Sequence, residues 1–322
     1  METRQLGNSG IEIPPFGIGC NRLTDAADPG LFATVDEALS RDVTHFDSAE
    51  SYGDGRSEEF LAAALKGRRN RAFIASKFGM RHVGGKTVVC GTPEYLREAC
   101  DLSLGRLRTD RIDLYYQHRV DPNVPVEETW GAMKELVDAG KVRSLGISNP
   151  TVEEIRRAHA VHPVSALQME YSLFTRGVED EFLPLCRELG ITFVAYGPLA
   201  FALLSGKITS KEDFPESDRY RRNMPRFQDE NIGHNLELLR TLREVAGELG
   251  GTPGQAALKW LMDNPVHVVP IPGSRRKEHL IENAGACGLE LTAEQYRRLS
   301  DAYPAGAAKG DNRPRMGATR AG

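Results

Sequence analysis

Three stretches decide how this sequence folds: THFDSAESYG (residues 44–53), AFIASKFG (72–79) and IDLYYQHR (112–119). Each begins with a short run of apolar, β-branched or aromatic residues, which is typical of a buried strand. Polar side chains follow each run, and the notable ones are Asp47, Tyr52, Lys77 and His118. A carboxylate, a phenol, an amine and an imidazole at neighbouring strand ends can form a proton-donating site.

Runs of the same kind recur along the chain and alternate with amphipathic helical stretches. We expect eight strands, at 13–19, 43–46, 72–76, 112–116, 142–147, 164–169, 191–196 and 267–271. Helices are predicted between them, for example at 93–107, where Thr92 and Pro93 make a good start, and at 126–140, which ends at Gly140. Eight strand-then-helix units favour a single parallel (β/α)8 TIM barrel.

The competing architecture is a doubly wound open sheet with a dinucleotide-binding first turn. Its G-x-G-x-x-G signature is incomplete here, because GIGCNR at 17–22 has arginine at the third glycine position. We therefore expect one barrel domain over 1–322, with a β-hairpin at RQLGNSGIEI (4–13) across its floor. Long loops at 79–91 and 198–232 follow strands and are expected on the catalytic face, and 302–322 is expected to be a flexible tail.

Bulk properties exclude several function classes. The 322 residues are 40% hydrophobic and 27% charged with a net charge of -4, and without a basic stripe we expect no nucleic-acid partner. RRNR at 68–71 is interpreted as a solvated turn, and GGKT at 84–87 is no P-loop, because residue 80 is methionine. The five cysteines are dispersed without metal spacing, and no apolar run is long enough for a membrane helix. We expect a cytoplasmic protein without a metal or membrane partner, and nothing in the sequence specifies an oligomeric state.

Each of the four polar side chains can be given a separate chemical role. Strand alternation places His45 and Asp47 on one face, so that Asp47 points into the barrel and needs a partner, for which Lys77 is the natural choice. A lysine beside Tyr52 is expected to lower the pKa of the phenol. Tyr52 could then protonate a carbonyl oxygen that His118 orients. Any one of these residues alone could be purely structural, but four at successive strand ends favour a site.

These stretches resemble the aldo-keto reductases. FDSAESYG is similar to the family's F-D-T-A-x-x-Y-G, with Ser48 in place of threonine, and IASKFG and YYQHR are similar to its lysine and histidine segments. GISN (146–149) and ALQMEYS (166–172) resemble its next two strands, and RFQDENIGHNLELLRTL (226–242) resembles the auxin-induced or perakine-reductase-like branch. The resemblance spans essentially the whole chain. It implies an NADPH-dependent reductase of a small-molecule aldehyde or ketone, with Asp47, Tyr52, Lys77 and His118 as the catalytic tetrad.

The resemblance also implies where NADPH binds. The nicotinamide would meet Ser148, Asn149, Gln168 and Tyr196, the last by stacking. The segment at 197–207 would wrap the pyrophosphate, and its named members are Gly197, Leu199 and Lys207. The adenosine end would lie on 272–283, which supplies Gly273, Ser274, Arg275, His279, Glu282 and Asn283. Adjacent arginines at a helix start favour a phosphate dianion independently, so Arg275, with Arg276 beside it, is expected at the 2′-phosphate.

Some residues of the expected cofactor site depart from the family pattern, and the substrate pocket is expected among the loop residues. The family's Y-S-P-L-G-R-G is Y-G-P-L-A-F-A here, at 196–202, and so lacks a serine hydroxyl and an arginine. His279 stands where arginine or glutamine is usual. Expected substrate-pocket residues are Asn21, Arg22, Met80, Arg81, Arg119 and Phe201.

Two other functions are compatible with the residues. A barrel of this kind could sense cofactor redox state for a partner, binding NADPH with little turnover. Asp47 and Glu50 could instead serve as a glycosidase carboxylate pair, which requires both side chains in one pocket.

Overall fold

The computed structural model describes residues 2–311, which group into two compact units. The barrel unit comprises Met1–Met169, Glu179–Tyr196 and Asn264–Ala284, and the helical unit comprises Glu170–Val178, Gly197–Asp263 and Gly285–Gly322. The single domain expected over 1–322 stays a prediction.

Eight parallel strands form the centre of the barrel unit. Their order is β3(Gly17–Gly19), β4(His45–Asp47), β5(Phe73–Phe78), β8(Leu114–Gln117), β9(Leu145–Ser148), β10(Ala166–Glu170), β11(Thr192–Tyr196) and β12(Val268–Pro270). The two outer strands meet through a parallel bridge between Gly19 and Gly273, and Gly19 N donates to Pro272 O at 3.2 Å. The sheet therefore closes on itself, which confirms the predicted (β/α)8 TIM barrel and its eight strands.

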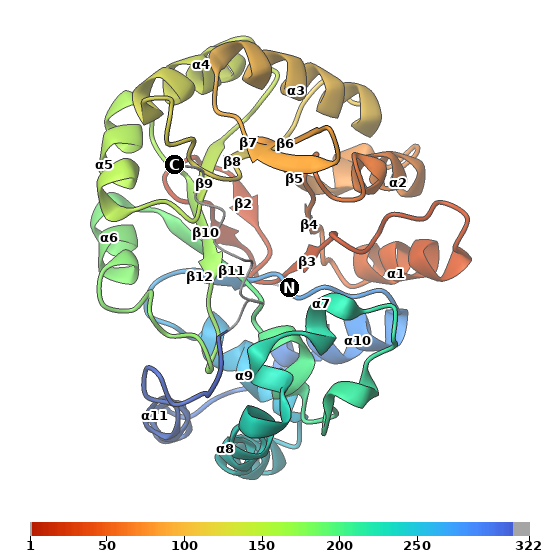
Figure 1. The fold of residues 1–322 in the computed structure, drawn as a ribbon, viewed down its shortest axis with the longest axis vertical. Coiled ribbons are helices and arrows are strands. Elements are labelled where there is room, and N and C mark those ends of the chain that lie inside the picture. The colour runs from red at the N-terminus through yellow and green to blue at the C-terminus, as the bar shows by residue number, and fades with distance from the viewer. Residues whose placement is uncertain (1, 312–322) are drawn as a thin grey trace. The chain divides into compact units, whose positions relative to one another are not determined.

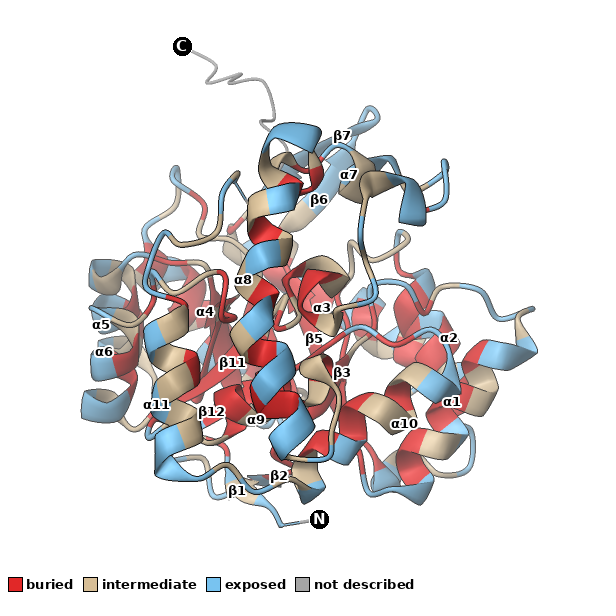
Figure 2. Cartoon of the chain, turned by 90° about the horizontal axis from the view of Figure 1, so that it is seen from below, coloured by how far each residue is buried: buried red, intermediate tan, exposed pale blue. Residues whose placement is uncertain are grey.

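Helices lie outside these strands (Figure 1), and their starts follow from local sequence. They are α1(Pro29–Ser40), α2(Arg56–Ala64), α3(Pro93–Leu107), α4(Val126–Asp138), α5(Val152–Val161), α6(Phe182–Leu189) and α10(Lys277–Gly285). The predicted start at Thr92 and Pro93 is confirmed, because Thr92 Oγ1 accepts from Tyr95 N at 3.3 Å. In α5 a capping box joins Thr151 and Glu154. Buried residues line one side of α1 and α2 and exposed residues the other (Figure 2), which is the pattern of a helix packed on a core.

The predicted N-terminal hairpin is present. Strands β1(Arg4–Gln5) and β2(Glu12–Ile13) pair antiparallel. Leu6, Ile11 and Ile13 are buried in one cluster with Phe73 and Leu114, from the central strands. The hairpin thus covers the barrel floor with apolar side chains.

The segment 79–91, expected to be a loop, contains a second hairpin. Strands β6(Met80–Val83) and β7(Lys86–Val89) pair antiparallel, and Gly84 and Gly85 turn between them with φ of 57° and 75°. A Gly-Gly pair between two strand-forming runs is a hairpin signal, because both central residues of a type I′ turn need positive φ. This hairpin stands between Lys77 at the end of β5 and the start of α3.

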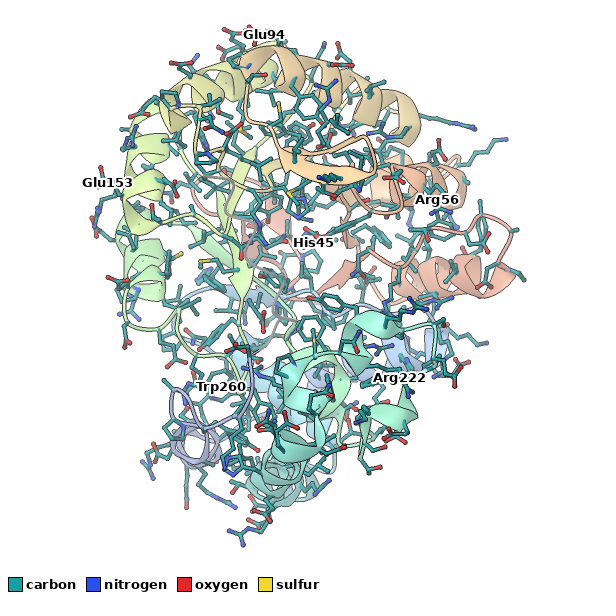
Figure 3. All side chains as sticks on the ribbon, viewed as in Figure 1. His45, Arg56, Glu94, Glu153, Arg222 and Trp260 are labelled. Atoms are coloured by element: carbon teal, nitrogen blue, oxygen red, sulfur yellow. The ribbon has the colours of Figure 1, made fainter. Side chains whose placement is uncertain are left out.

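The helical unit is built on α8(Asp229–Glu248), α9(Pro253–Met262) and α11(Ala293–Ala302), with a short α7(Arg219–Arg222) and the 3-10 turns η2(Ala200–Ser205), η3(Lys211–Asp213), η4(Pro225–Phe227) and η5(Ala286–Gly288). Trp260, labelled in Figure 3, packs against Tyr171 and is stacked on Tyr296. These contacts give the unit its own apolar centre.

The expected tail starts inside a helix, because α11 ends at Ala302. Beyond it, Asn235 Nδ2 donates to Lys309 O at 2.9 Å and accepts from Lys309 N at 2.8 Å through Oδ1. Arg226 Nε donates to Gly310 O at 3.2 Å. The chain is therefore anchored up to this point, and the rest of the expected tail, 312–322, lies outside the described residues.

Candidate active site

An ion pair inside the barrel forms the base of the site. Asp47 ends β4 and Lys77 lies near the end of β5, and both side chains are fully buried. Lys77 Nζ donates to Asp47 Oδ1 and, at 2.7 Å, to Ser48 O. The other oxygen, Asp47 Oδ2, accepts from Gln168 Nε2 at 2.7 Å. The carboxylate is thus partnered on both oxygens, as a buried charge requires.

The ammonium of Lys77 keeps its proton. Burial lowers its pKa, but the interactions of the ammonium with Asp47 and, second, with Tyr52 together outweigh burial, and the net pKa is raised. The site therefore holds a permanent positive charge at neutral pH.

Tyr52 lies in the turn that follows β4. Tyr52 N donates to Ala49 O at 3.1 Å, and the side chain is half-buried. Lys77 Nζ is 5.0 Å from the centre of the Tyr52 ring. The His118 ring meets the Tyr52 ring edge to face, with centroids 5.9 Å apart. The structure thus brings the four predicted side chains together at the carboxyl ends of neighbouring strands.

The expected lowering of the Tyr52 pKa is wrong for the protein alone. Burial raises this pKa, and the charge of Lys77 lowers it by less, so the net shift is upward. Lys77 therefore limits the cost of ionising Tyr52 without removing it. At neutral pH the phenol carries its proton, which is the state that a proton donor needs.

His118 follows β8 directly and is neutral. Its backbone N donates to Phe78 O at 2.9 Å. Burial, with Lys77 and Arg119, holds the pKa of the imidazole well below its ordinary value of 6.5. Among the described residues, its buried Nδ1 has no hydrogen-bond partner. A neutral imidazole at this place can donate one hydrogen bond to a substrate oxygen.

Three of the predicted nicotinamide residues form a connected group at the ends of β9 and β11. Tyr196 Oη donates to Asn149 Oδ1 at 2.9 Å, and Asn149 Nδ2 donates to Ser148 Oγ at 2.7 Å. Asn149 has a left-handed backbone with φ of 52°. The Gln168 side chain is turned instead toward Asp47, and its backbone O contacts this group, by accepting from Asn149 N at 3.1 Å.

The predicted adenosine segment leads from β12 into α10. Buried Ser274 accepts at Oγ from Asn283 Nδ2 at 3.2 Å. Arg275 and Arg276 are exposed before the first turn, and Arg276 Nη2 is 3.0 Å from His279 Nε2. Gly273 is exposed and Glu282 is half-buried. Arg275 and Arg276 therefore directly precede the start of α10 at Lys277, and their contact with a phosphate stays a prediction.

The predicted pyrophosphate residues Gly197, Leu199 and Lys207 belong to the helical unit. Gly197 has φ of 61°, and Lys207 is exposed. Between them, Ala200, Phe201 and Ala202 have positive φ values of 47°, 58° and 84°. Phe201, expected in the substrate pocket, packs on Tyr220 with ring centroids 6.0 Å apart.

The remaining pocket candidates lie in the barrel unit in different surroundings. Asn21 and Arg22 are exposed, whereas Met80 and Arg119 are half-buried. Arg81 lies over the Tyr95 ring, 5.1 Å from its centre. Because residues alternate along a strand, Arg81 and Met80 point to opposite faces of the hairpin, and we expect only one of them to face the site.

Two carboxylates that the sequence analysis did not place in the reductase site also matter. Glu50 Oε1 accepts from Gly79 N at 2.8 Å, so it is engaged with backbone while Asp47 binds Lys77 and Gln168. This arrangement gives no support to a glycosidase pair. Asp121 Oδ2 accepts from Gly91 N at 2.9 Å. The signal for Glu50 was its place inside FDSAESYG, whereas Asp121 had none.

Over residues 2–311 no cluster of three or more potential metal ligands occurs. Within the same range, no helix has the length and apolar character to cross a membrane.

Comparison with known proteins decides the family. The model of the aldo/keto reductase family matches residues 15–304. The chain belongs to this family. It is 40% identical over 309 residues to probable aldo-keto reductase 1 from Glycine max, covering 94% of this chain and 89% of that protein. Membership makes the chain an oxidoreductase of the carbonyl-reducing class, while the perakine-reductase-like branch stays a prediction.

Solved structures of other oxidoreductases share the fold. The glycerol dehydrogenase AKR11B4 from Gluconobacter oxydans superposes with a TM-score of 0.86 at 28% identity, over 93% of this chain and 94% of that one. An aldo/keto reductase from Klebsiella pneumoniae, solved in complex with NADP and acetate, has a TM-score of 0.75 at 26% identity, over 97% and 99%.

Proposed function

We propose that this aldo-keto reductase uses NADPH to reduce an aldehyde or ketone, with Tyr52 as the proton donor. The observation that carries the proposal is the buried Asp47–Lys77 pair beneath the Tyr52 ring, with the His118 ring edge-on to it. A neutral phenol beside a fixed ammonium is suited to release a proton as negative charge develops on a neighbouring oxygen.

Each residue of the tetrad has a distinct role in this proposal. Tyr52 donates its proton to the carbonyl oxygen of the substrate. Lys77 stabilises the phenolate that remains, and Asp47 holds Lys77 charged and in place. The neutral His118 hydrogen-bonds the same oxygen and orients the carbonyl. When bound, NADPH would supply the hydride.

The residues present fit NADPH. Ser148, Asn149 and Tyr196 offer hydroxyl and amide groups at two strand ends, which suits a carboxamide and a flat ring. Arg275 and the α10 start offer charge to a 2′-phosphate. The NADP complex of the Klebsiella pneumoniae relative supports this choice. Gly197, Leu199 and Lys207 are proposed at the pyrophosphate.

A cofactor comparison tests the proposal. We expect NADPH to support reduction of a panel of aromatic and aliphatic aldehydes better than NADH. Arg275→Ala should raise the KM for NADPH by about 10-fold, because it removes one charge-assisted contact of roughly 1.5 kcal/mol. The KM for NADH should stay unchanged, because NADH has no 2′-phosphate. Arg297→Ala, elsewhere on the surface, is the matched control. Preference of the wild type for NADH would contradict the phosphate assignment.

The proposed substrate is a small molecule, and we propose the half-buried Met80 and Arg119 as pocket residues of the barrel unit. The five free cysteines support the proposed cytoplasmic location.

A further inference from the structure

One carboxylate oxygen of Glu50 accepts hydrogen bonds from two other segments that lie next to the tetrad. Glu50 lies two residues before Tyr52 in the turn after β4. Its Oε1 accepts from Gly79 N at 2.8 Å, from Met80 N at 3.1 Å and from Tyr95 Oη at 3.0 Å. Three hydrogen bonds to one oxygen fix the position of the Glu50 carboxylate and leave its side chain little freedom to move.

The donors come from segments that carry or flank the other catalytic groups. Gly79 and Met80 follow Lys77 by two and three residues, at the base of the β6–β7 hairpin. Tyr95 is in the first turn of α3. Glu50 also uses its own backbone, because Glu50 N donates to Lys77 O at 3.0 Å. The turn that presents Tyr52 is thus fastened twice to the end of the strand that presents Lys77.

The hairpin base is fastened on its other side to the segment that carries His118. Asp121, three residues after His118, accepts from Gly91 N at 2.9 Å through a buried side chain. Cys90 N donates to Gly79 O at 3.1 Å, which closes the base of the hairpin. The segments that carry Tyr52 and His118 are therefore both hydrogen-bonded to the backbone at the base of the β6–β7 hairpin.

Glu50 acts here through geometry. Burial raises its pKa, and the Met80, Tyr95 and Gly79 hydrogen bonds lower it in part. Besides burial, the main electrostatic influences on the pKa of Tyr52 are Lys77 and Asp47. Removing the charge of Glu50 should therefore change the ionisation of Tyr52 little, whereas removing its oxygen should free the Tyr52 turn.

We propose that Glu50 is a positioning residue for the proton donor, holding the Tyr52 turn against the hairpin base through Oε1. This inference rests on the proposed function, since it assigns the role of Glu50 relative to proton donation by Tyr52. An error of about 1 Å in a catalytic group can cost on the order of 100-fold in rate.

Two substitutions at this position separate geometry from charge. Glu50→Gln keeps an oxygen that can accept the same three hydrogen bonds, and we expect its kcat to stay within about 3-fold of wild type, with an unchanged pH profile. Glu50→Ala removes the oxygen, and we expect kcat to fall roughly 10- to 100-fold while the Kd of NADPH, from fluorescence titration, changes less than about 2-fold. Tyr95→Phe removes one donor and should give an intermediate loss of kcat.

A matched control separates positioning from general destabilisation. Asp113 is also a buried carboxylate, with Arg69 and Ile74 N as partners, but it lies before β8, away from the tetrad. Asp113→Ala should lower the melting temperature at least as much as Glu50→Ala and leave kcat at the assay temperature within about 2-fold.

Hydrogen exchange of the segment 48–57 gives a readout that needs no turnover. We expect faster exchange there in Glu50→Ala than in Glu50→Gln or wild type. Equal exchange in all three, or equal kcat in wild type and Glu50→Ala, would overturn the inference, and so would a Glu50→Gln variant as slow as Glu50→Ala. A wild type that oxidises no NADPH with any carbonyl would instead refute the proposed function, and the exchange data would still decide whether Glu50 fixes the turn.

Discussion

Lys77 keeps a full positive charge inside the barrel because several partners stabilise it. Its Nζ is bonded to Asp47 Oδ1 and Ser48 O, and its charge faces the Tyr52 ring. His45, which shares the inward face of β4 with Asp47, lies in the middle of the strands (Figure 3) and stays neutral, since burial lowers its pKa to about 4. Asp47 and Lys77 thus form a charged pair below the proposed reacting groups.

Breaking this pair should be costly for folding. Asp47→Asn would leave the Lys77 ammonium buried beside a neutral amide, and we expect the free energy of unfolding to fall by about 3–5 kcal/mol in urea titrations. The double variant Asp47→Asn/Lys77→Met should recover part of that loss, because it removes the unpaired charge. Glu127→Gln, which breaks an exposed pair with Arg157, serves as the control and should leave the urea midpoint nearly unchanged. A midpoint for Asp47→Asn equal to that of wild type would contradict a charged Lys77.

The two shifted pKa values predict a broad pH plateau. Tyr52 donates only when protonated, and because its pKa is raised above 10.0, the donor is lost only as pH rises through that raised value. His118 is neutral until pH falls below its lowered pKa, well under 6.5. We therefore expect kcat/KM for carbonyl reduction to stay level from about pH 6.5 to about pH 10. A midpoint close to 6.5 that disappears in His118→Asn would show that the imidazole is not held neutral.

At the scale of elements, the loop 197–207 combines an unusual sequence with an unusual backbone. The family pattern has glycine at positions 200 and 202, and this chain has alanine at both. Ala200, Phe201 and Ala202 nevertheless keep positive φ values, the region that glycine adopts without steric cost. Each non-glycine residue held there costs roughly 1–2 kcal/mol, so the backbone of this element conflicts locally with its side chains.

Restoring glycine should relieve that conflict. Ala202 has φ of 84° and ψ of -2°, and Ala202→Gly should raise the free energy of unfolding by about 1 kcal/mol and tighten NADPH binding. The control is Ala63→Gly on the exposed side of α2, where glycine should destabilise by about 1 kcal/mol. Both are measured by urea unfolding and NADPH titration. Equal destabilisation by the two substitutions would show that Ala202 is not strained.

At the scale of the whole molecule, strand patterns predicted the fold because each buried strand reads as an apolar run and the eight runs alternate with helices. The proximity of Asp47, Tyr52, Lys77 and His118 could be predicted for the same reason, since all four follow those runs. The β6–β7 hairpin was not predicted because all its strand residues except Met80 are exposed and carry no apolar alternation, although Gly84-Gly85 marks the turn.

The remaining features of the site could not be predicted, because they depend on three-dimensional distances that the spacing of residues in the sequence does not determine. The upward pKa of Tyr52 arises from burial outweighing Lys77, and both depend on how deeply the turn sits. The bonds from Glu50 to Gly79 and Tyr95 join residues 29 and 45 positions apart. The turn of Arg81 toward Tyr95 follows from the register of a hairpin that was itself not predicted.

The central claim is that Tyr52 is the proton donor in NADPH-dependent carbonyl reduction, and one measurement addresses it most directly. The loss of NADPH absorbance with an aromatic aldehyde is followed for wild type, Tyr52→Phe and the control Tyr296→Phe, with NADPH binding confirmed by titration. We predict that kcat of Tyr52→Phe falls by roughly 100- to 10,000-fold while Tyr296→Phe matches wild type. Equal kcat in wild type and Tyr52→Phe, with both binding NADPH, would contradict the account.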